Sequence, residues 1–268
     1  MIDKSAQEVL DIIKQEKYAG AQKAAREGTK LYTPQNIEEL RNKGGLVQGN
    51  QCGIIVTEET TQIAAHRLVV KEKMDDVVLL NFASGKHPGG GFLRGSRAQE
   101  EDLCRCSGLY DCLANSVGYY EYNIEKKTSL YSDHIMYSPN VPWFRKSSKD
   151  APGDLFLASV ITSPAPNAGA YLSTHIDGLA EVIKVLKRRA EAILLIAYEN
   201  GHKNLILGAW GCGVFANPPE IVATIFKELL QDSKYASAFD HVTFAIYGDM
   251  INTITFKKIL ESNKQEKV

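Results

Sequence analysis

The chain has 268 residues, of which 44 % are hydrophobic and 24 % are charged, and its formal net charge is −1. This size and composition suit one large α/β domain, or a domain with an extension, that can bury a full core. The near-zero charge excludes an overall basic footprint for nucleic acid, so we expect no direct DNA binding.

The first part of the chain is predicted to be helical. Apolar residues recur at helical spacing over residues 5–27, and residues 37–41 have the pattern of a second, short helix. No strand pattern precedes residue 49. We therefore predict a helical extension over residues 1–48 and the main domain over residues 49–268.

The main domain is predicted to alternate strands and helices. Strands are expected at 53–56, 77–82, 155–161, 204–207 and 242–247. Helices are expected at 59–68, from 99 onwards, and at 175–199, 218–230 and 252–260. Continuous apolar runs such as 77–82 are typical of strands that are covered on both faces. The pattern predicts an α/β fold with a largely parallel sheet.

Residues 119–147 are rich in aromatic side chains. Prolines in and just after this stretch argue against regular elements. One interpretation is a long surface loop with a packed aromatic underside. The other is a wall of a binding cleft, because long loops in compact domains are usually functional.

Three loops rich in glycine or proline follow three of the predicted strands, at 84–98, 163–170 and 208–217. Ligands of open α/β sheets bind at the carboxyl ends of strands, and free backbone N–H groups at helix starts favour phosphate. The loops fit neither G-x-G-x-x-G nor G-x-x-x-x-G-K-[ST], which excludes the two common nucleotide fingerprints. We expect a ligand with an extended phosphate–sugar frame.

Two adjacent carboxylic acids, Glu100 and Glu101, stand at the start of the helix predicted from residue 99. Acidic residues in a first helical turn often only stabilise the helix dipole. The preceding glycines favour chemistry instead, because carboxylic acids transfer protons at glycosidic oxygens. Neighbours on a helix point about 100° apart, so one glutamate would transfer the proton while the other holds a sugar hydroxyl.

The sequence indicates no metal site and no cofactor. The five cysteines are odd in number, which argues against a disulfide framework, and their spacing and that of the six histidines fit no metal pattern. The start of the chain lacks an apolar signal core, and no apolar run reaches the roughly 18 residues of a membrane span. We expect a cytoplasmic protein without a membrane segment.

The glycines and glutamates together carry a family resemblance. Gly89, Gly90 and Gly91, then seven residues, then Gln99-Glu100-Glu101 resemble the signature of poly(ADP-ribose) glycohydrolases. The surrounding runs at 81–91, 137–142 and 163–169 resemble the shorter, microbial type, and Gly211-Cys212-Gly213-Val214-Phe215 is similar to the diphosphate loop of macrodomains. The resemblance implies a macrodomain-like fold with a mixed, largely parallel sheet.

The resemblance also implies roles for single residues. Glu101 would be the catalytic acid/base for hydrolysis of the ribose–ribose bond, and Glu100 would hold hydroxyls of the departing ribose. The substrate-binding residues would be Gly89, Gly90, Gly91, Gln99, Gly211, Cys212, Gly213, Val214, Phe215 and Asn81. The position on the distal ribose could also be Ser84 or His87, and Glu59 is a candidate for contacting adenine. The glycines would shape the cradle, the second loop would donate N–H groups to the diphosphate, and Phe215 would pack on the terminal ribose.

The expected partners are poly(ADP-ribose) or an ADP-ribosylated protein, with ADP-ribose as the product. Two alternatives stay open at this point. The same loops would serve a module that binds ADP-ribose without cleaving it, and the same anomeric chemistry would serve a hydrolase of mono-ADP-ribosyl groups.

Overall fold

The computed structural model describes residues 2–43, 52–232 and 235–261. Within these residues, seven strands form one sheet in the order β1-β4-β5-β3-β6-β7-β2. The strands are β1 (Lys30–Tyr32), β2 (Gly53–Thr57), β3 (Val77–Phe82), β4 (Ile135–Trp143), β5 (Phe156–Ser163), β6 (Asn204–Leu207) and β7 (His241–Ala245). The pairs β1–β4 and β4–β5 are antiparallel and the other four are parallel, which confirms the mixed, largely parallel sheet.

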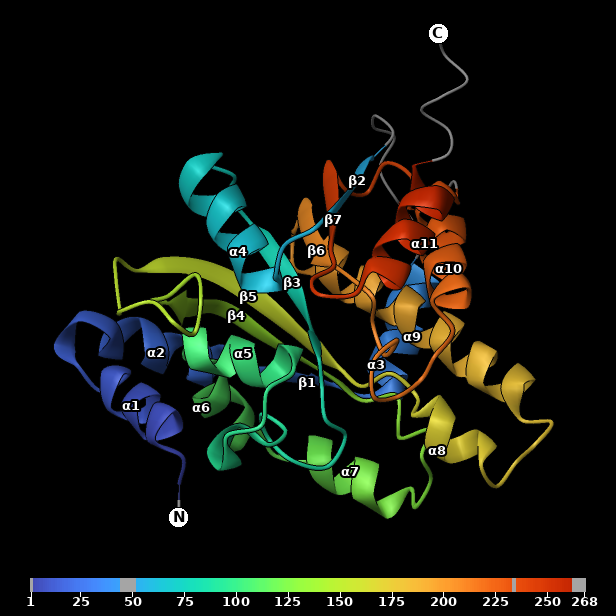
Figure 1. Cartoon of the computed structure of the whole chain (residues 1–268), viewed down its shortest axis with the longest axis horizontal. Coiled ribbons are helices and arrows are strands. Elements are labelled where there is room, and N and C mark those ends of the chain that lie inside the picture. The colour runs from blue at the N-terminus through green and yellow to red at the C-terminus, as the bar shows by residue number, and fades with distance from the viewer. Residues whose placement is uncertain (1, 44–51, 233–234, 262–268) are drawn as a thin grey trace, which may run out of the picture.

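Helices cover both faces of the sheet (Figure 1). One face packs mainly against α1 (Lys4–Ile12), α2 (Glu16–Gly28), α4 (Thr61–His66), α5 (Gln99–Cys106), α6 (Leu109–Ala114) and α7 (Tyr119–Glu125). The other face packs mainly against α3 (Pro34–Lys43), α8 (Ala168–Leu172), α9 (Leu179–Glu199), α10 (Pro219–Gln231) and α11 (Met250–Leu260). The fold is thus a three-layer α/β/α sandwich.

The central strand β3 shows why the apolar runs form strands of this kind. Val77 and Leu79 belong to the core on one face, whereas Val78 and Leu80 belong to the core on the other. Side chains of a strand alternate between faces, so a strand buried on both faces must be apolar throughout. This packing fixes the carboxyl end of β3, from which the first glycine loop emerges.

The N-terminal region differs from the prediction in two ways. The helix expected over residues 5–27 is two helices, α1 and α2, with a turn between them. Residues 30–32 form β1, whose pairing with β4 adds it to the sheet, so the expectation of no strand in this region was wrong. The predicted boundary between residues 48 and 49 lies outside the described residues.

The aromatic stretch 119–147 is more regular than expected. It contains α7 and the nine-residue strand β4, so the prediction of an irregular region was wrong. The register of β4 against β5 shifts between Ser138 and Val141, and Asn140 has a φ of 46°. This bulge accommodates Pro139, which cannot donate a ladder hydrogen bond.

The other elements start or end within a few residues of their predicted positions. The helix expected from residue 175 begins at Leu179, and the helix expected over 59–68 ends at His66 and continues as a π-turn, Arg67–Lys71. None of the described helices is both long enough and apolar enough to cross a membrane.

Candidate active site

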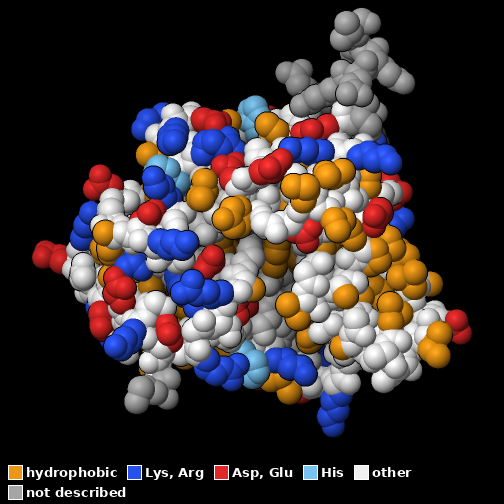
Figure 2. Space-filling model, in the orientation of Figure 1, with side chains coloured by type: hydrophobic (Ala, Val, Ile, Leu, Met, Phe, Trp, Pro, Cys, Tyr) orange, Lys and Arg blue, Asp and Glu red, His pale blue; other side chains and the backbone are white. Residues whose placement is uncertain are grey.

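A cleft of about 770 Å³ opens at the carboxyl ends of the parallel strands. It is lined by Phe82 at the end of β3, Ala165 after β5, Trp210 after β6 and Ile246 after β7. This is the edge at which ligands of open α/β sheets bind. Figure 2 shows a hollow near the centre of this face, with Lys and Arg side chains gathered on its border over α5.

Gln99 connects the start of α5 to the central strand. Its side-chain oxygen accepts a hydrogen bond from the Phe82 N–H at 2.9 Å, and its amide nitrogen donates to the Leu80 carbonyl at 2.8 Å. The same nitrogen donates to the Thr61 hydroxyl at 3.1 Å. Gln99 borders the cleft, but these bonds direct it towards the protein and fix the first turn of α5 against β3.

Glu100 lies at the inner wall of the cleft and is only 3 % exposed. Its carboxylate accepts hydrogen bonds from the Asn81 side-chain amide at 3.1 Å and from the Ser84 N–H at 2.7 Å. Burial raises the pKa of Glu100 to about 8, against the two hydrogen bonds, which lower it. Burial therefore favours the protonated form of this carboxyl group.

Glu101 also borders the cleft, and one backbone amide orients it. The Gly91 N–H donates a hydrogen bond of 2.8 Å to Glu101 Oε1. Gly90 lies against the same carboxylate with a φ of 58°, and a Cβ there would stand 2.5 Å from Oε1. Only glycine allows both this backbone conformation and this close approach.

In the first glycine loop, the N–H groups of Gly90 and Gly91 donate hydrogen bonds to acceptors of the protein itself. The Gly90 N–H donates to the His87 carbonyl at 3.0 Å, and the Gly91 N–H is taken by Glu101. Gly89, with a φ of 62°, packs away from the cleft, and a Cβ there would stand 2.9 Å from the Tyr110 ring. Gly90 and Gly91 thus position the Glu101 carboxylate, and both also border the cleft, so their part in a cradle for ribose and diphosphate stays a prediction.

The second loop, residues 208–217, is built in the opposite way. Its turn is closed by Asn217, whose buried side-chain amide donates to the carbonyls of Gly211 and Pro166, both at 2.9 Å. The amides of Gly213, Val214 and Phe215 have no acceptor in the part of the chain that the structure describes. Successive free N–H groups of this kind form an anion-binding concavity.

Three comparisons place this geometry among known proteins. A model of the family described as microbial-type PARG, catalytic domain, matches residues 6–146, which include the first glycine loop and both glutamates. The chain belongs to the microbial-type poly(ADP-ribose) glycohydrolase family. Among curated proteins, none matches this chain.

Solved structures of this family are similar over nearly the whole chain. The poly(ADP-ribose) glycohydrolase of Thermomonospora curvata is 39 % identical, with a TM-score of 0.89 over 95 % of this chain and 97 % of that one. Its complex with the inhibitor ADP-HPD is 38 % identical, with a TM-score of 0.86 over the same shares. The Deinococcus radiodurans enzyme in complex with ADP-ribose is 42 % identical, with a TM-score of 0.81 over 90 % of this chain and 97 % of that one.

The structure brings most of the predicted site residues to one cleft. Those that border it are Glu100, Glu101, Gly90, Gly91, Gln99, Gly211, Gly213, Val214 and Phe215. Three predicted residues do not border the cleft. Asn81 is fully buried behind Glu100, Gly89 packs against Tyr110, and the Cys212 thiol points to the Trp210 carbonyl.

Several cleft residues were missed from the sequence. Tyr131 borders the cleft with a φ of 60°, and its ring lies 5.9 Å from that of Phe215. Gly85 makes room for it, because a Cβ there would stand 2.6 Å from the Tyr131 ring. The aromatic stretch was the available signal, and for Tyr131 its interpretation as a cleft wall is the better one.

The far part of the cleft was also missed. It is bordered by Tyr247, Asp249 and Asn252, which follow β7 and begin α11. Glu59, which the sequence had offered as a candidate for contacting adenine, also borders the cleft and pairs with Arg67 at 2.7 Å. No group of three or more His, Cys, Asp or Glu side chains in the described residues is arranged to hold a metal ion.

Proposed function

We propose that this protein hydrolyses the ribose–ribose O-glycosidic bond of poly(ADP-ribose) and releases ADP-ribose. Family membership supports the proposal, and one observation carries it. The carboxylate of Glu101, oriented by Gly91, borders the same cleft as the three free amides of residues 213–215. A proton donor and a diphosphate site in one cleft suit the cleavage of a sugar bond next to a diphosphate.

Glu101 would act as acid and then as base. Its carboxyl group gives a proton to the leaving ribose oxygen as the glycosidic bond breaks, and the remaining sugar passes through an oxocarbenium-like state. The resulting carboxylate then removes a proton from the water that attacks the anomeric carbon.

Glu100 would hold the reacting ribose and limit the charge beside Glu101. Its raised pKa of about 8 keeps it neutral at pH 7, so it donates a hydrogen bond to a ribose hydroxyl. A neutral neighbour also avoids a second negative charge close to Glu101 and the diphosphate. Asn81 and the Ser84 N–H fix its orientation from behind.

The rest of the cleft would position the terminal ADP-ribose unit. The amides of Gly213, Val214 and Phe215 would donate to the diphosphate, and the paired rings of Phe215 and Tyr131 would confine the terminal ribose. The adenosine half would then extend towards Tyr247 and the start of α11. We keep the cytoplasm as the expected location.

The decisive experiment is incubation with purified poly(ADP-ribose) and identification of the products. Release of free ADP-ribose supports the proposal. Tight binding of ADP-ribose without any product would indicate a binding module. Cleavage of mono-ADP-ribosylated protein with no cleavage of the polymer would indicate the mono-ADP-ribosyl hydrolase.

A further inference from the structure

Two arginines of the first loop differ from all the others in the chain. The sequence has nine arginines, and seven of them form ion pairs with carboxylates: Arg26, Arg41, Arg67, Arg105, Arg145, Arg188 and Arg189. Arg94 and Arg97 have no hydrogen-bond or ion-pair partner among the described residues. Both are exposed, and both border the cleft.

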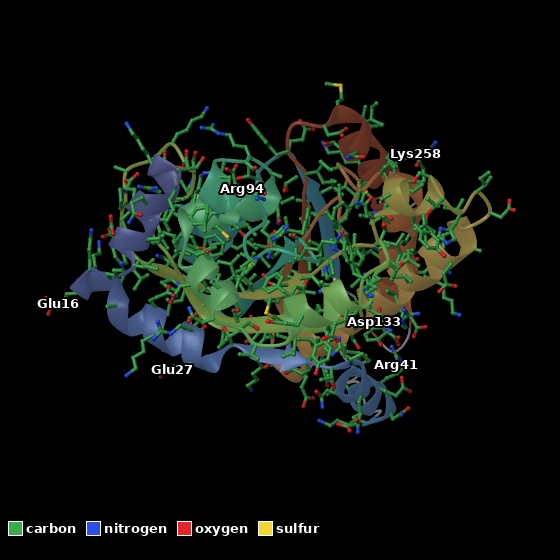
Figure 3. The ribbon with its side chains drawn as sticks, turned by 90° about the horizontal axis from the view of Figure 1, so that it is seen from below. Glu16, Glu27, Arg41, Arg94, Asp133 and Lys258 are labelled. Atoms are coloured by element: carbon green, nitrogen blue, oxygen red, sulfur yellow. The ribbon has the colours of Figure 1, made fainter. Side chains whose placement is uncertain are left out.

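A third cation completes this group. Lys86 is exposed, borders the cleft, and its ammonium has no partner within the described residues. Of the acidic residues that border the same cleft, Asp102 pairs with Arg105, and the Glu101 carboxylate accepts the Gly91 N–H. In Figure 3, Arg94 lies beside α5. Arg41 and Asp133, which pair with Glu191 and Arg189 respectively, lie on the lower side of that view.

The loop that carries the arginines is anchored next to the catalytic carboxylate. The Ser96 N–H donates to the Gly91 carbonyl at 3.1 Å, and Arg105 donates to the Ser96 carbonyl at 2.5 Å. The Asp3 N–H donates to the Leu93 carbonyl at 2.9 Å. Arg94 and Arg97 are therefore held beside Gly91, whose N–H orients Glu101.

The position of these cations relative to Glu101 decides which phosphate they suit. The free amides of residues 213–215 already provide a site for the diphosphate of the terminal unit. With the bond to be broken at Glu101, as proposed, the loop that holds Glu101 through Gly91 and carries the cations borders the path of the remaining chain. Each further unit of that chain has its own diphosphate, and arginine is well suited to bind phosphate oxygens in pairs.

Resting on the proposed function, we infer that Lys86, Arg94 and Arg97 form a second phosphate subsite, which binds the diphosphate of the unit on the leaving side of the scissile bond. The enzyme would then hold a chain on both sides of Glu101. Long chains should therefore bind better than free ADP-ribose, and the difference should shrink as salt screens the exposed cations.

The test compares Arg94→Gln/Arg97→Gln with Lys14→Gln/Lys184→Gln. The control lysines are exposed and do not border the cleft, and their substitution also removes two positive charges. We measure KM for long poly(ADP-ribose) over a range of salt concentrations, and the inhibition constant of ADP-ribose. The arginine variant should raise KM about tenfold at low salt and, because two cations are removed, flatten the slope of log KM against log salt by about 1.5. The inhibition constant of ADP-ribose should change less than twofold.

Three outcomes would overturn the subsite. KM could stay at the unsubstituted value, the lysine control could raise it equally, or the inhibition constant of ADP-ribose could rise in step with KM. Binding of the polymer, measured by fluorescence anisotropy with a DNA oligonucleotide as competitor, does not depend on turnover. If the unsubstituted protein binds the chain in this assay but never cleaves it, the proposed function fails while the subsite stands. Equal competition by the oligonucleotide would indicate a general polyanion surface and reject the subsite.

Discussion

The two glycine loops at the mouth of the cleft look alike in sequence and do opposite things. In the first loop, the amides of Gly90 and Gly91 bind acceptors of the protein itself, one of them the Glu101 carboxylate. In the second loop, the amides of residues 213–215 are left without acceptors among the described residues. The first loop therefore positions the Glu101 carboxylate, and the second leaves amides open to an anion.

The contrast shows that glycine is useful for two separate properties, the missing Cβ and the accessible backbone. At Gly90 the useful property is the missing Cβ, because any side chain would collide with Glu101. At Gly213 a Cβ would meet nothing within 4 Å, so the useful property there is the accessible backbone. Substitutions in the two loops should accordingly affect different steps, rate in one case and affinity in the other.

The largest effect is expected from removing the acid that the first loop positions. Glu101→Gln keeps the shape of the side chain and an oxygen for the Gly91 N–H, but it cannot transfer a proton. Turnover of poly(ADP-ribose) should fall by ~10²–10⁴-fold, while ADP-ribose still binds in isothermal calorimetry. Glu125→Gln, on the exposed side of α7, is the matched control. Near-normal turnover of Glu101→Gln would remove its proposed role.

The next effect comes from Gly90→Ala, which leaves the acid in place but displaces it. The new Cβ would stand 2.5 Å from Glu101 Oε1, at a φ of 58° that alanine disfavours. A shift of about 1 Å in a catalytic group can cost ~10²-fold in rate, so kcat should fall by about that factor. The dissociation constant of ADP-ribose should change much less.

Gly20→Ala is the control for Gly90→Ala, because Gly20 lies in α2 with nothing within 4 Å of its added Cβ. Steady-state kinetics and a melting curve for both variants separate displacement of Glu101 from a loss of folding. A Gly90→Ala variant whose rate is normal would show that Glu101 does not depend on this close approach.

The corresponding change in the second loop should act on affinity. In Gly211→Ala the Cβ would stand 2.4 Å from Ala165 Cβ, at a φ of 75°, so the turn that aims the free amides must shift. Hydrogen bonds to a charged group are worth about 1.5–3 kcal/mol each. The dissociation constant of ADP-ribose should rise about 10- to 100-fold, with a smaller change in kcat at saturating substrate. Equal effects of the Gly90 and Gly211 variants on rate would erase the distinction between the loops.

The fold could be predicted where local pattern and tertiary packing agree. β3 was predicted with its observed limits because Val77–Phe82 is apolar on both faces. β4 was missed because Pro139 and Pro142 argue against a strand, and only pairing with β5 through a bulge makes one possible. β1 was missed because its three residues are a strand only through their pairing with β4.

For the site, the sequence could indicate which residues gather at the cleft but not what each backbone amide binds. Glu100, Glu101 and the second loop were found by motif. The bond from Gly91 to Glu101 and the closure of the second loop by Asn217 depend on contacts between separate segments. That Arg94 and Arg97 lack partners among the described residues is likewise visible only once the partners of the other arginines are known.

The last prediction concerns pH and tests whether Glu100, at the start of α5 beside the first loop, titrates in the working range. In the second loop, burial raises the pKa of Cys212 to about 12, whereas burial raises the pKa of Glu100 to about 8 from an ordinary value of 4.5. Between these two values for Glu100 the folded protein holds a proton that the unfolded chain has released. The free energy of unfolding should therefore fall as pH rises from about 5 to 8, by at most ~1.4 kcal/mol per pH unit, and level off above pH 8.

Glu100→Gln lacks this proton and isolates the effect. Urea unfolding of the unsubstituted protein and of Glu100→Gln, at pH 5, 6, 7, 8 and 9, gives the difference between their free energies of unfolding. That difference should move in favour of the variant up to about pH 8 and then stay constant. Above about pH 8, Glu100 of the unsubstituted protein is ionised in the folded as well as in the unfolded state. Turnover of the unsubstituted enzyme should decline over the same upper range, since an ionised Glu100 no longer donates to the ribose hydroxyl. If the difference between the two free energies of unfolding is the same at every pH from 5 to 9, Glu100 is ionised throughout this range. Its assignment as the neutral donor beside Glu101 would then be wrong.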